Sequence, residues 1–324
     1  SCSPTSPASR AVTARAEPGR WRPAASTLRR LTLAALLANI AIVASGGLVR
    51  LTDSGLGCPS WPDCAGTSVI PPRQLSWHKY VEFGNRLFTY VVLIAVVAAL
   101  IGVLRARPRR PDLRLWAWLT FLGVPAQALM GGITVLTHLN PWAVAAHFVL
   151  SMLLVASATV LWWRTRRPVD VRMPRPLAPL PPLLRQLTWV TWALTYVVFA
   201  AGTVVTGSGP HAGDASARRI EIKPETISQL HADLVMLLVG LAVALAVAVT
   251  ALGAAPAVRV TTRLLVAALA VQAAIGFAQY FDKLPIGLVE LHMIGAAGIA
   301  AAATAMVLAA VDPIGVRHEN AVRP

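Results

Sequence analysis

Three of the seven histidines in the chain fall inside long apolar segments, where an imidazole can bind a metal or a haem iron. His147 lies about five residues into one segment, His292 about six residues into another, and His231 near the start of a third. At roughly 1.5 Å per helical residue, each imidazole lies within ~10 Å of the outer end of its helix. Histidines at a matching depth in a helical bundle are the usual axial ligands of haem, so His231 and His292 are expected to form a pair.

These histidines have other possible roles besides the ligation of haem iron. A single intramembrane histidine can instead be a hydrogen-bonding partner between helices, because a polar group inside a span needs one. A copper or zinc site is disfavoured, because two histidines leave the coordination sphere short and no thiolate or carboxylate cluster lies at that depth in the second half. The sequence assigns no role to His78, His138 and His211.

A carboxylate and an amide occupy the matching region in the first half of the chain. Asn85, in the segment VEFGNRL, stands where the second half has His231, so one ligand is missing. Glu82 is three residues before Asn85 and four before Arg86, which makes them neighbours on a helix. A carboxylate that faces His147 across a bundle can act as an acid or a base. The alternative is a local Glu82–Arg86 ion pair at the membrane surface, and the sequence leaves both open.

The elements that must position these residues are membrane-spanning helices. Of the 324 residues, 56% are hydrophobic and only 13% are charged, whereas soluble domains carry about 25% charged residues. This composition disfavours a soluble enzyme. Eight segments approach the roughly 20 apolar residues that cross a bilayer core. The expected spans are about 31–50, 83–104, 115–136, 142–163, 186–206, 230–252, 260–281 and 286–310.

The distribution of charge predicts how these spans are oriented. The net charge of +15 by itself suggests nucleic acid, but the basic residues lie between the apolar segments and therefore indicate membrane topology. If the chain starts in the cytoplasm, 21 of its 29 Lys and Arg residues are cytoplasmic. The positive-inside rule then places both termini in the cytoplasm and the haem sites toward the outer face. We expect a multi-pass protein of the cell membrane that contacts lipid and binds no nucleic acid.

An internal repeat predicts how the helices are grouped. The segment GLVRLTDSG resembles GTVVTGSG about 155 residues later, and Gln127 and His147 recur 145 residues later as Gln272 and His292. Four helices return the chain to its starting side, so the two copies share one topology. We expect an all-α integral membrane protein of two four-helix bundles, related by a pseudo-twofold axis along the membrane normal.

The repeat and the composition together divide the chain into five parts. Residues 1–28 are expected to be a disordered cytoplasmic segment, because they are rich in Ser, Pro, Ala and Arg without apolar periodicity. The Pro- and Arg-rich stretch between the copies is expected to be a linker. The remaining boundaries are a first bundle at 29–163, the linker at 164–185, a second bundle at 186–311 and a cytoplasmic tail at 312–324.

Two of the three cysteines lie close together in the first outer loop. Cys58 and Cys64 bound the segment CPSWPDC, on the side expected to be oxidising. A structural disulfide, a redox-active disulfide and a free pair of thiols all remain open for them.

Several of these segments together resemble the haem A synthase family. They are GGLVRLTDSGLGCPSWPDCAG, EFGNRL, THLNPWAVAAHF, TVVTGSGPHAGD, ISQLHADL and VELHMIGAA, in the family's order across about 31–310. The resemblance implies an oxidoreductase that converts a ring methyl of haem O to a formyl group, giving haem A for cytochrome oxidase. It implies haem O as substrate and leaves open a haem O synthase, an electron donor and a second copy of the chain as partners.

The resemblance also implies roles for individual residues. His231 and His292 match the axial ligands of a haem b cofactor in the second copy. His147 matches a histidine of the substrate-haem site in the first copy, and Glu82 matches a carboxylate tied to catalysis.

Asn85 and Arg86 fall in the substrate-haem motif, and Asn85 departs from the histidine that many members carry, so the ligation of the substrate haem stays open. Cys58 and Cys64 match an outer-loop pair of the family.

Two other classes of protein were considered. A b-type cytochrome-like electron carrier without catalysis would favour haems near both membrane faces, whereas every intramembrane histidine here lies toward one face. A transporter would use the repeat but needs broken helices and polar sites at the midplane, and neither is visible in the sequence.

Overall fold

A computed structural model describes residues 21–58, 60–62, 64, 77–166 and 180–311. These residues form eight helices and no strand, and each helix is long and apolar enough to cross a membrane. The protein is therefore an all-α, multi-pass membrane protein, as the hydropathy predicts. The helices are α1 (Ala25–Leu51), α2 (Trp77–Arg105), α3 (Pro111–Leu136), α4 (Pro141–Thr165), α5 (Pro182–Ser208), α6 (Pro224–Ala251), α7 (Pro256–Phe281) and α8 (Ile286–Val311).

Several helices begin earlier than the apolar segments predict. Five of them start with a proline, whose fixed φ suits the first helical position. The polar turns that follow are helical although they add nothing to the hydropathy signal. Residues 25–28 were expected to be disordered, but they form the first turn of α1 because Leu28 packs in a buried cluster with Leu113 and Leu161. Residues 182–185 likewise belong to α5 and not to the expected linker.

Parts of the predicted organisation lie outside the described residues. They are most of the N-terminal segment, the middle of the linker and the C-terminal tail, at 1–20, 167–179 and 312–324.

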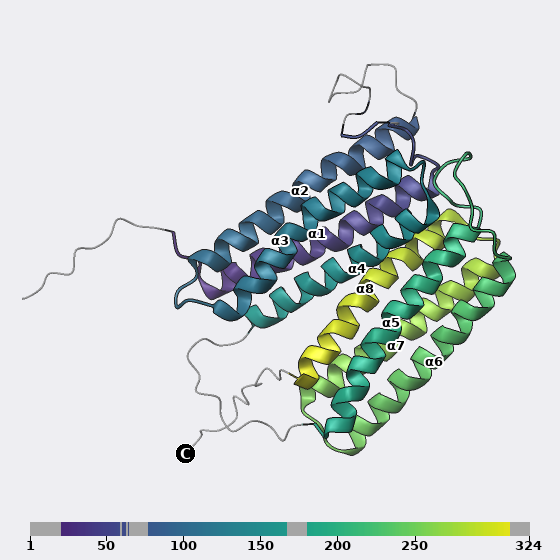
Figure 1. Cartoon of the computed structure of the whole chain (residues 1–324). Coiled ribbons are helices and arrows are strands. Elements are labelled where there is room, and N and C mark those ends of the chain that lie inside the picture. Colours follow the sequence, from purple (N-terminus) through teal and green to yellow (C-terminus); the bar gives the residue numbers. More distant parts are fainter. Residues whose placement is uncertain (1–20, 59, 63, 65–76, 167–179, 312–324) are drawn as a thin grey trace, which may run out of the picture.

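The helices form two rings of four, and neighbouring helices in each ring run antiparallel (Figure 1). In the first ring α1 contacts α2, α2 contacts α3, α3 contacts α4, and α4 closes onto α1. In the second ring α5, α6, α7 and α8 repeat this order. Each ring is a four-helix bundle of up-down topology.

The contacts between the bundles have the pattern of a twofold axis. The central contact joins α4 to α8, which are equivalent helices of the two copies. The flanking contacts join α1 to α8 and α5 to α4, and these pairs exchange when the copies are exchanged. An interface in which the same surface of each unit meets the other is the signature of twofold symmetry, so the pseudo-twofold arrangement is confirmed.

Small and fully buried side chains allow α4 and α8 to approach closely. Ala297, Ala300 and Ala303 of α8 and Val155 and Ala158 of α4 are all 0% exposed and belong to one core cluster. Between membrane helices, close packing of small residues replaces the hydrophobic effect as the main attraction.

Two hydrogen bonds tie α5 to the same interface. Trp192 Nε1 donates to Thr304 Oγ1 at 3.1 Å, and the Tyr196 hydroxyl donates to the Met152 carbonyl at 3.0 Å. Here α5 therefore bonds to both central helices.

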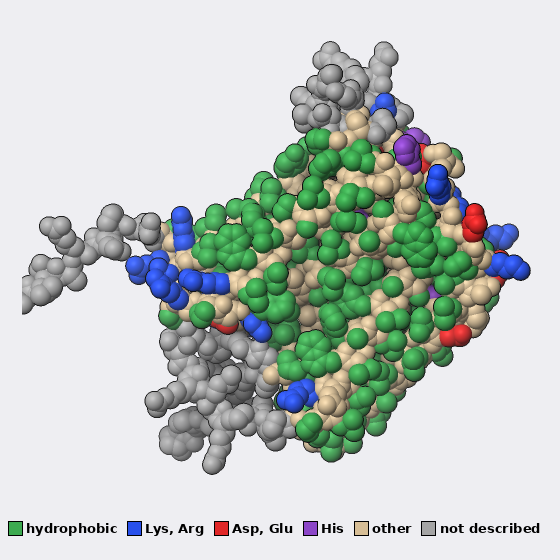
Figure 2. Space-filling view, in the orientation of Figure 1, with side chains coloured by type: hydrophobic (Ala, Val, Ile, Leu, Met, Phe, Trp, Pro, Cys, Tyr) green, Lys and Arg blue, Asp and Glu red, His purple; other side chains and the backbone are tan. Residues whose placement is uncertain are grey.

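The two ends of the bundles differ in the side chains that they carry. Hydrophobic side chains cover the middle of the molecule, and the Lys and Arg side chains gather toward its ends (Figure 2). We call the end that holds Cys58 and Cys64 the disulfide end. The opposite end, where α1 starts and α4 finishes, is called the arginine end after Arg29, Arg30 and Arg166.

The packing of α8 gives a first testable prediction. Ala300→Leu should destabilise the protein by ~1–3 kcal/mol, because extra methyl groups in a filled core force neighbours apart. Gly298→Leu is the matched control, since Gly298 is exposed on the same helix and an added Cβ there meets nothing within 4 Å. Thermal unfolding in detergent measures both variants. Equal loss in the two would contradict tight packing between α4 and α8.

Candidate functional site

Three intramembrane histidines lie at one level of the molecule. His147 and His292 are the seventh residues of α4 and α8, and His231 is the eighth residue of α6. These helices run in the same direction from the disulfide end, so each histidine lies about 9–11 Å from it along the helix. The Nδ1 atom of each ring is buried and has no hydrogen-bond partner among the described residues. Because a buried polar atom normally has a partner, these three rings are candidates for ligand contacts.

In the second bundle, glycines of the neighbouring helices make room for the histidine rings. An added Cβ at Gly202 of α5 would lie 3.1 Å from His231 Cε1, and one at Gly276 of α7 would lie 3.2 Å from His292 Cε1. The two histidines come from α6 and α8, which are diagonal in the ring, and they are near enough for their charges to interact. The pairing of His231 with His292 as haem ligands stays a prediction.

A cavity of about 60 Å³ lies beside this pair toward the disulfide end. It is lined by apolar residues such as Val205, Val289 and Met293 and by the polar residues Arg50 and His211. Gln279 also lines it, and Gln279 Oε1 is buried without a partner in the described part of the chain.

Glutamines hold two of the histidine helices at repeat-related positions. Gln272 Nε2 of α7 donates to the His292 carbonyl at 2.7 Å. Gln127 Nε2 of α3, which is 145 residues earlier, donates to Ser151 Oγ at 2.8 Å and to the His147 carbonyl at 3.5 Å. These bonds join α3 to α4 and α7 to α8 in the same way, so the repeat seen in the sequence extends to side-chain contacts.

Gly131 of α3 and Gly276 of α7 are also 145 residues apart, and each faces the histidine of its own copy. In the first copy an added Cβ at Gly131 would lie 3.7 Å from His147 Cε1. This glycine pair was not predicted from the sequence, although it has the same 145-residue spacing as the other repeated residues.

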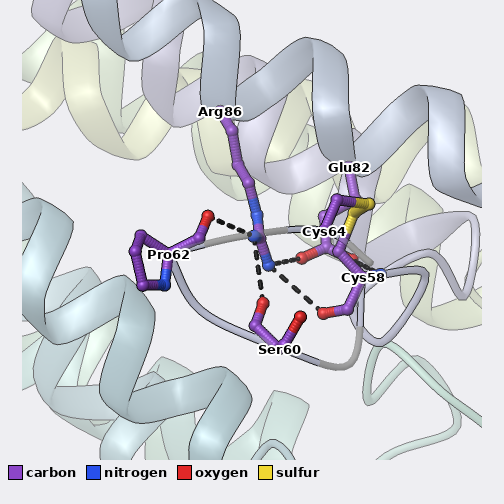
Figure 3. The surroundings of a disulfide bond; sticks show 6 residues. All are labelled: Cys58, Ser60, Pro62, Cys64, Glu82 and Arg86. Carbon is purple, nitrogen blue, oxygen red and sulfur yellow. Dashed lines mark hydrogen bonds and ion pairs between the residues drawn. A yellow bond between two sulfur atoms is a disulfide. The ribbon is translucent and has the colours of Figure 1, made fainter. Parts of the chain in front are cut away.

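In the first bundle, Glu82 binds the loop that contains the disulfide (Figure 3). Cys58 and Cys64 are joined by a disulfide, with their Cα atoms 4.5 Å apart. The Cys58 backbone N–H donates to Glu82 Oε2 at 2.6 Å, and Arg86 donates to Glu82 Oε1 at 2.6 Å. Glu82 is only 4% exposed, so its two partners satisfy a buried carboxylate.

Arg86 fastens the same loop through its backbone carbonyls. Its guanidinium donates to the carbonyl oxygens of Ser60 at 3.1 Å, Pro62 at 3.2 Å and Cys58 at 3.2 Å (Figure 3). The expected Glu82–Arg86 ion pair is therefore present, but it is an anchor for the disulfide loop and not a solvated pair at the surface. The bonds of both Glu82 oxygens go to the loop and to Arg86 rather than to His147.

The disulfide loop covers the disulfide end of the first bundle. Trp61 packs on Gly132 of α3, where an added Cβ would lie 2.6 Å from the indole ring. Gly57 packs on the backbone of α2, where an added Cβ would lie 2.8 Å from the His78 carbonyl oxygen. The loop thus closes onto two helices, and Trp61 is part of this cover.

Asn85 joins α2 to α1 at the position that matches His231. The Ser45 hydroxyl donates to Asn85 Oδ1 at 2.6 Å. The amide oxygen is thereby committed to a contact between helices.

The remaining described histidines have contacts within loops and turns. His78 Nδ1 bonds to the Thr52 carbonyl at 2.9 Å, and His211 Nε2 bonds to the Leu284 carbonyl at 2.9 Å. His138 lies exposed in the turn between α3 and α4, with a φ of 51°.

Arg50 ties the end of α1 to the loop that follows α5. It donates from Nε to the His211 carbonyl at 2.8 Å and from its guanidinium to the Thr206 carbonyl at 3.0 Å.

Glu290 was not predicted from the sequence as a candidate functional residue. It lies two residues before His292 in α8, and its carboxylate rests against Gly47 of α1, between the two bundles. Both of its oxygens are buried without a partner in the described chain. An ionisable residue inside a span suggests function by default, and this rule could have found it.

The fold and the site define a class of protein: a membrane protein made of two copies of a four-helix bundle, with unpartnered histidines at one level in both. The family model for cytochrome oxidase assembly proteins, COX15-CtaA, matches residues 29–304. The chain belongs to this family.

Bacterial relatives named heme A synthase are similar to parts of the chain. The relative from Geobacillus kaustophilus is 38% identical over 130 residues, which cover 39% of this chain and 40% of the relative. The one from Lysinibacillus sphaericus is 33% identical over 135 residues, 41% of this chain and 43% of the relative. The one from Symbiobacterium thermophilum is 32% identical over 186 residues, 56% of this chain and 60% of the relative. The matched segments thus span between about two fifths and three fifths of these relatives.

The close contact at Gly57 predicts the effect of one methyl group. Gly57→Ala should push the disulfide loop off α2 and break the Cys58–Glu82 hydrogen bond, because the contacted atoms belong to the backbone and cannot turn aside. Losing a hydrogen bond to a buried carboxylate should cost ~1–3 kcal/mol.

Hydrogen exchange of the Cys58 amide and thermal unfolding measure this effect. Gly84→Ala is the control, since Gly84 is exposed on α2 and a Cβ there meets nothing within 4 Å. Slow Cys58 exchange in Gly57→Ala would contradict the described packing of the loop.

Proposed function

We propose that this protein is a haem A synthase, which oxidises a ring methyl of haem O to the formyl group of haem A for cytochrome oxidase. The observation that carries the proposal is the set of three unpartnered imidazoles at one level, two in one bundle and one in the other. Membership of the cytochrome oxidase assembly family and relatives named heme A synthase support the same activity.

The second bundle fits a resident haem b held by His231 and His292. Both rings carry a buried nitrogen without a partner, and Gly202 and Gly276 leave space beside them. A haem held by both of these imidazoles would supply electron transfer and would not bind dioxygen.

Around this haem the chain keeps its ligands in place. Gln272 fixes the backbone of α8 at His292, and the packing of α8 on α4 fixes that helix against the first bundle.

The first bundle fits the substrate haem. His147 offers the iron one imidazole. Asn85 has no imidazole to offer, and its amide oxygen accepts from Ser45. Ligation by one histidine leaves a position open, which suits an oxidation at the iron, whereas the two-histidine site does not. The difference between His231 and Asn85 thus assigns electron transfer to one bundle and oxidation to the other.

Glu82 and Arg86 act at the cover of the substrate site. Glu82 is the proposed acid–base group of the oxidation. Its buried carboxylate can take up a proton when the hydrogen bond from Cys58 or from Arg86 breaks. Arg86 holds Glu82 and the disulfide loop together, so it keeps water away from the substrate edge. The Cys58–Cys64 disulfide closes the loop and restrains the backbone groups that make these bonds.

The charge pattern supports an orientation in the cell membrane. The arginine end faces the cytoplasm by the positive-inside rule, so both termini are cytoplasmic and both haem sites lie toward the outer face. Haem O then enters within the membrane, with a haem O synthase as a supplier and a separate electron donor. An electron carrier with haems near both faces is disfavoured, because all three intramembrane histidines lie near the disulfide end.

The cofactor site predicts a spectroscopic result. His231→Ala and His292→Ala should each abolish the low-spin haem spectrum of the purified protein, since one remaining imidazole cannot keep the iron six-coordinate. His138→Asn is the control, because His138 is exposed in a turn and Asn tolerates its positive φ. Reduced-minus-oxidised spectra measure the outcome. An unchanged spectrum in both alanine variants would refute the assignment.

The substrate site predicts a separation of the two haems. Glu82→Gln and His147→Ala should retain the haem b spectrum but lower haem A formation at least tenfold, because both residues belong to the first bundle. Extraction and mass analysis of the haems measure both quantities. Glutamine keeps an oxygen that can accept from the Cys58 amide. Normal haem A production by Glu82→Gln would therefore contradict the acid–base role and leave Glu82 only the role of anchoring the loop.

A further inference from the structure

A second pocket lies at the arginine end, far from the histidines. It has a volume of about 310 Å³ and is lined by Arg29, Arg30, Leu33, Trp162 and Arg166. Its walls are the first turns of α1 and the last turn of α4. Since α1 has 27 residues, this pocket lies ~30 Å along the helix from the level of the histidines.

The polar groups that line this pocket donate hydrogen bonds and carry positive charge. Among the described residues, none of the three arginines forms an ion pair or a side-chain hydrogen bond, whereas Arg110 at the same end pairs with Asp112 at 2.9 Å. Trp162 Nε1 is buried and has no hydrogen-bond partner among the residues described.

Two contacts hold the Arg166 guanidinium close to the protein. It lies over the rings of Trp162 at 5.2 Å and Trp163 at 4.8 Å, which restricts its position. Burial, and to a smaller extent the nearby positive charge of Arg29, lower the pKa of Arg166. An anion in the pocket would relieve this repulsion and accept from the donors.

We propose that this pocket binds the phosphate headgroup of an anionic membrane phospholipid. Basic pockets at the ends of transmembrane helices recognise such headgroups, and arginine pairs with phosphate through two parallel hydrogen bonds. Apolar side chains next to the pocket favour a lipid over free phosphate. Leu33 lines the pocket one turn deeper than Arg29 and Arg30, and Leu37 follows on the same face and is 55% exposed. An acyl chain would run along these leucines while the headgroup stays with the arginines.

The test compares lipid retention by two variants with equal loss of charge. The pocket variant is Arg29→Gln, Arg30→Gln, Arg166→Gln. The control is Arg105→Gln, Arg109→Gln, Arg114→Gln, which removes three exposed arginines from the same end outside the pocket. Each full-length protein is purified from mixed vesicles of phosphatidylglycerol and phosphatidylcholine, and native mass spectrometry counts the bound lipids.

The wild-type protein and the control should retain phosphatidylglycerol over phosphatidylcholine at least fivefold, and the pocket variant should lose this preference. Equal loss in both variants would overturn the proposal, because it would indicate a general charge effect. A wild-type protein without any preference would overturn it as well.

A second measurement on the wild-type protein does not depend on how the variants fold. Phosphatidylglycerol should raise the thermal unfolding midpoint in detergent, and phosphatidylcholine at the same concentration should not. Millimolar inorganic phosphate is the third arm. A rise with phosphate as large as that with phosphatidylglycerol would identify a free-anion site and contradict the lipid, as would a rise with phosphatidylcholine.

Discussion

A polar side chain inside a membrane-spanning helix costs free energy unless another group satisfies it, and this constraint organises the whole molecule. Most polar groups in these helices obey it locally. Thr191 and Thr195 bond to carbonyls one turn earlier, and Trp192 bonds to Thr304 across the bundle interface. The buried groups without a described partner include the imidazole Nδ1 atoms of His147, His231 and His292 and the indole of Trp162, together with others such as Gln279 and Glu290. Some of these groups lie where ligands are proposed.

The duplication explains how one fold can carry two chemical roles. The copies share their ring order, their glutamine ties and the glycines that face His147 and His292. They differ where the roles differ. The second copy has His231 where the first copy has Asn85, and the first copy adds Glu82, Arg86 and the disulfide loop. Packing of α4 on α8 brings the two roles together, and Glu290 lies between them against α1.

Hydropathy predicted eight helices because twenty apolar residues leave the backbone no other way to satisfy its hydrogen bonds in lipid. The repeat predicted the two bundles for a similar reason, since equal spacing from Gln127 to His147 and from Gln272 to His292 gives equal depth. The Glu82–Arg86 pair was among the predicted alternatives, but the bond from the Cys58 amide to Glu82 was not predicted, because the path of the loop depends on contacts such as Trp61 on Gly132 that local sequence does not encode. The helical turn at residues 25–28 was missed because its stability comes from Leu28 packing on distant residues. Glu290 was missed because a single charge barely alters the hydropathy of α8.

Counting the haems of the purified wild-type protein tests the division of roles most directly. The protein is produced with and without a source of haem O, and its haems are extracted, identified by mass and counted per chain. The account predicts one haem b per chain without haem O, and haem A in addition when haem O is supplied. Two haems b per chain under both conditions, with no haem A, would contradict it and would indicate an electron carrier.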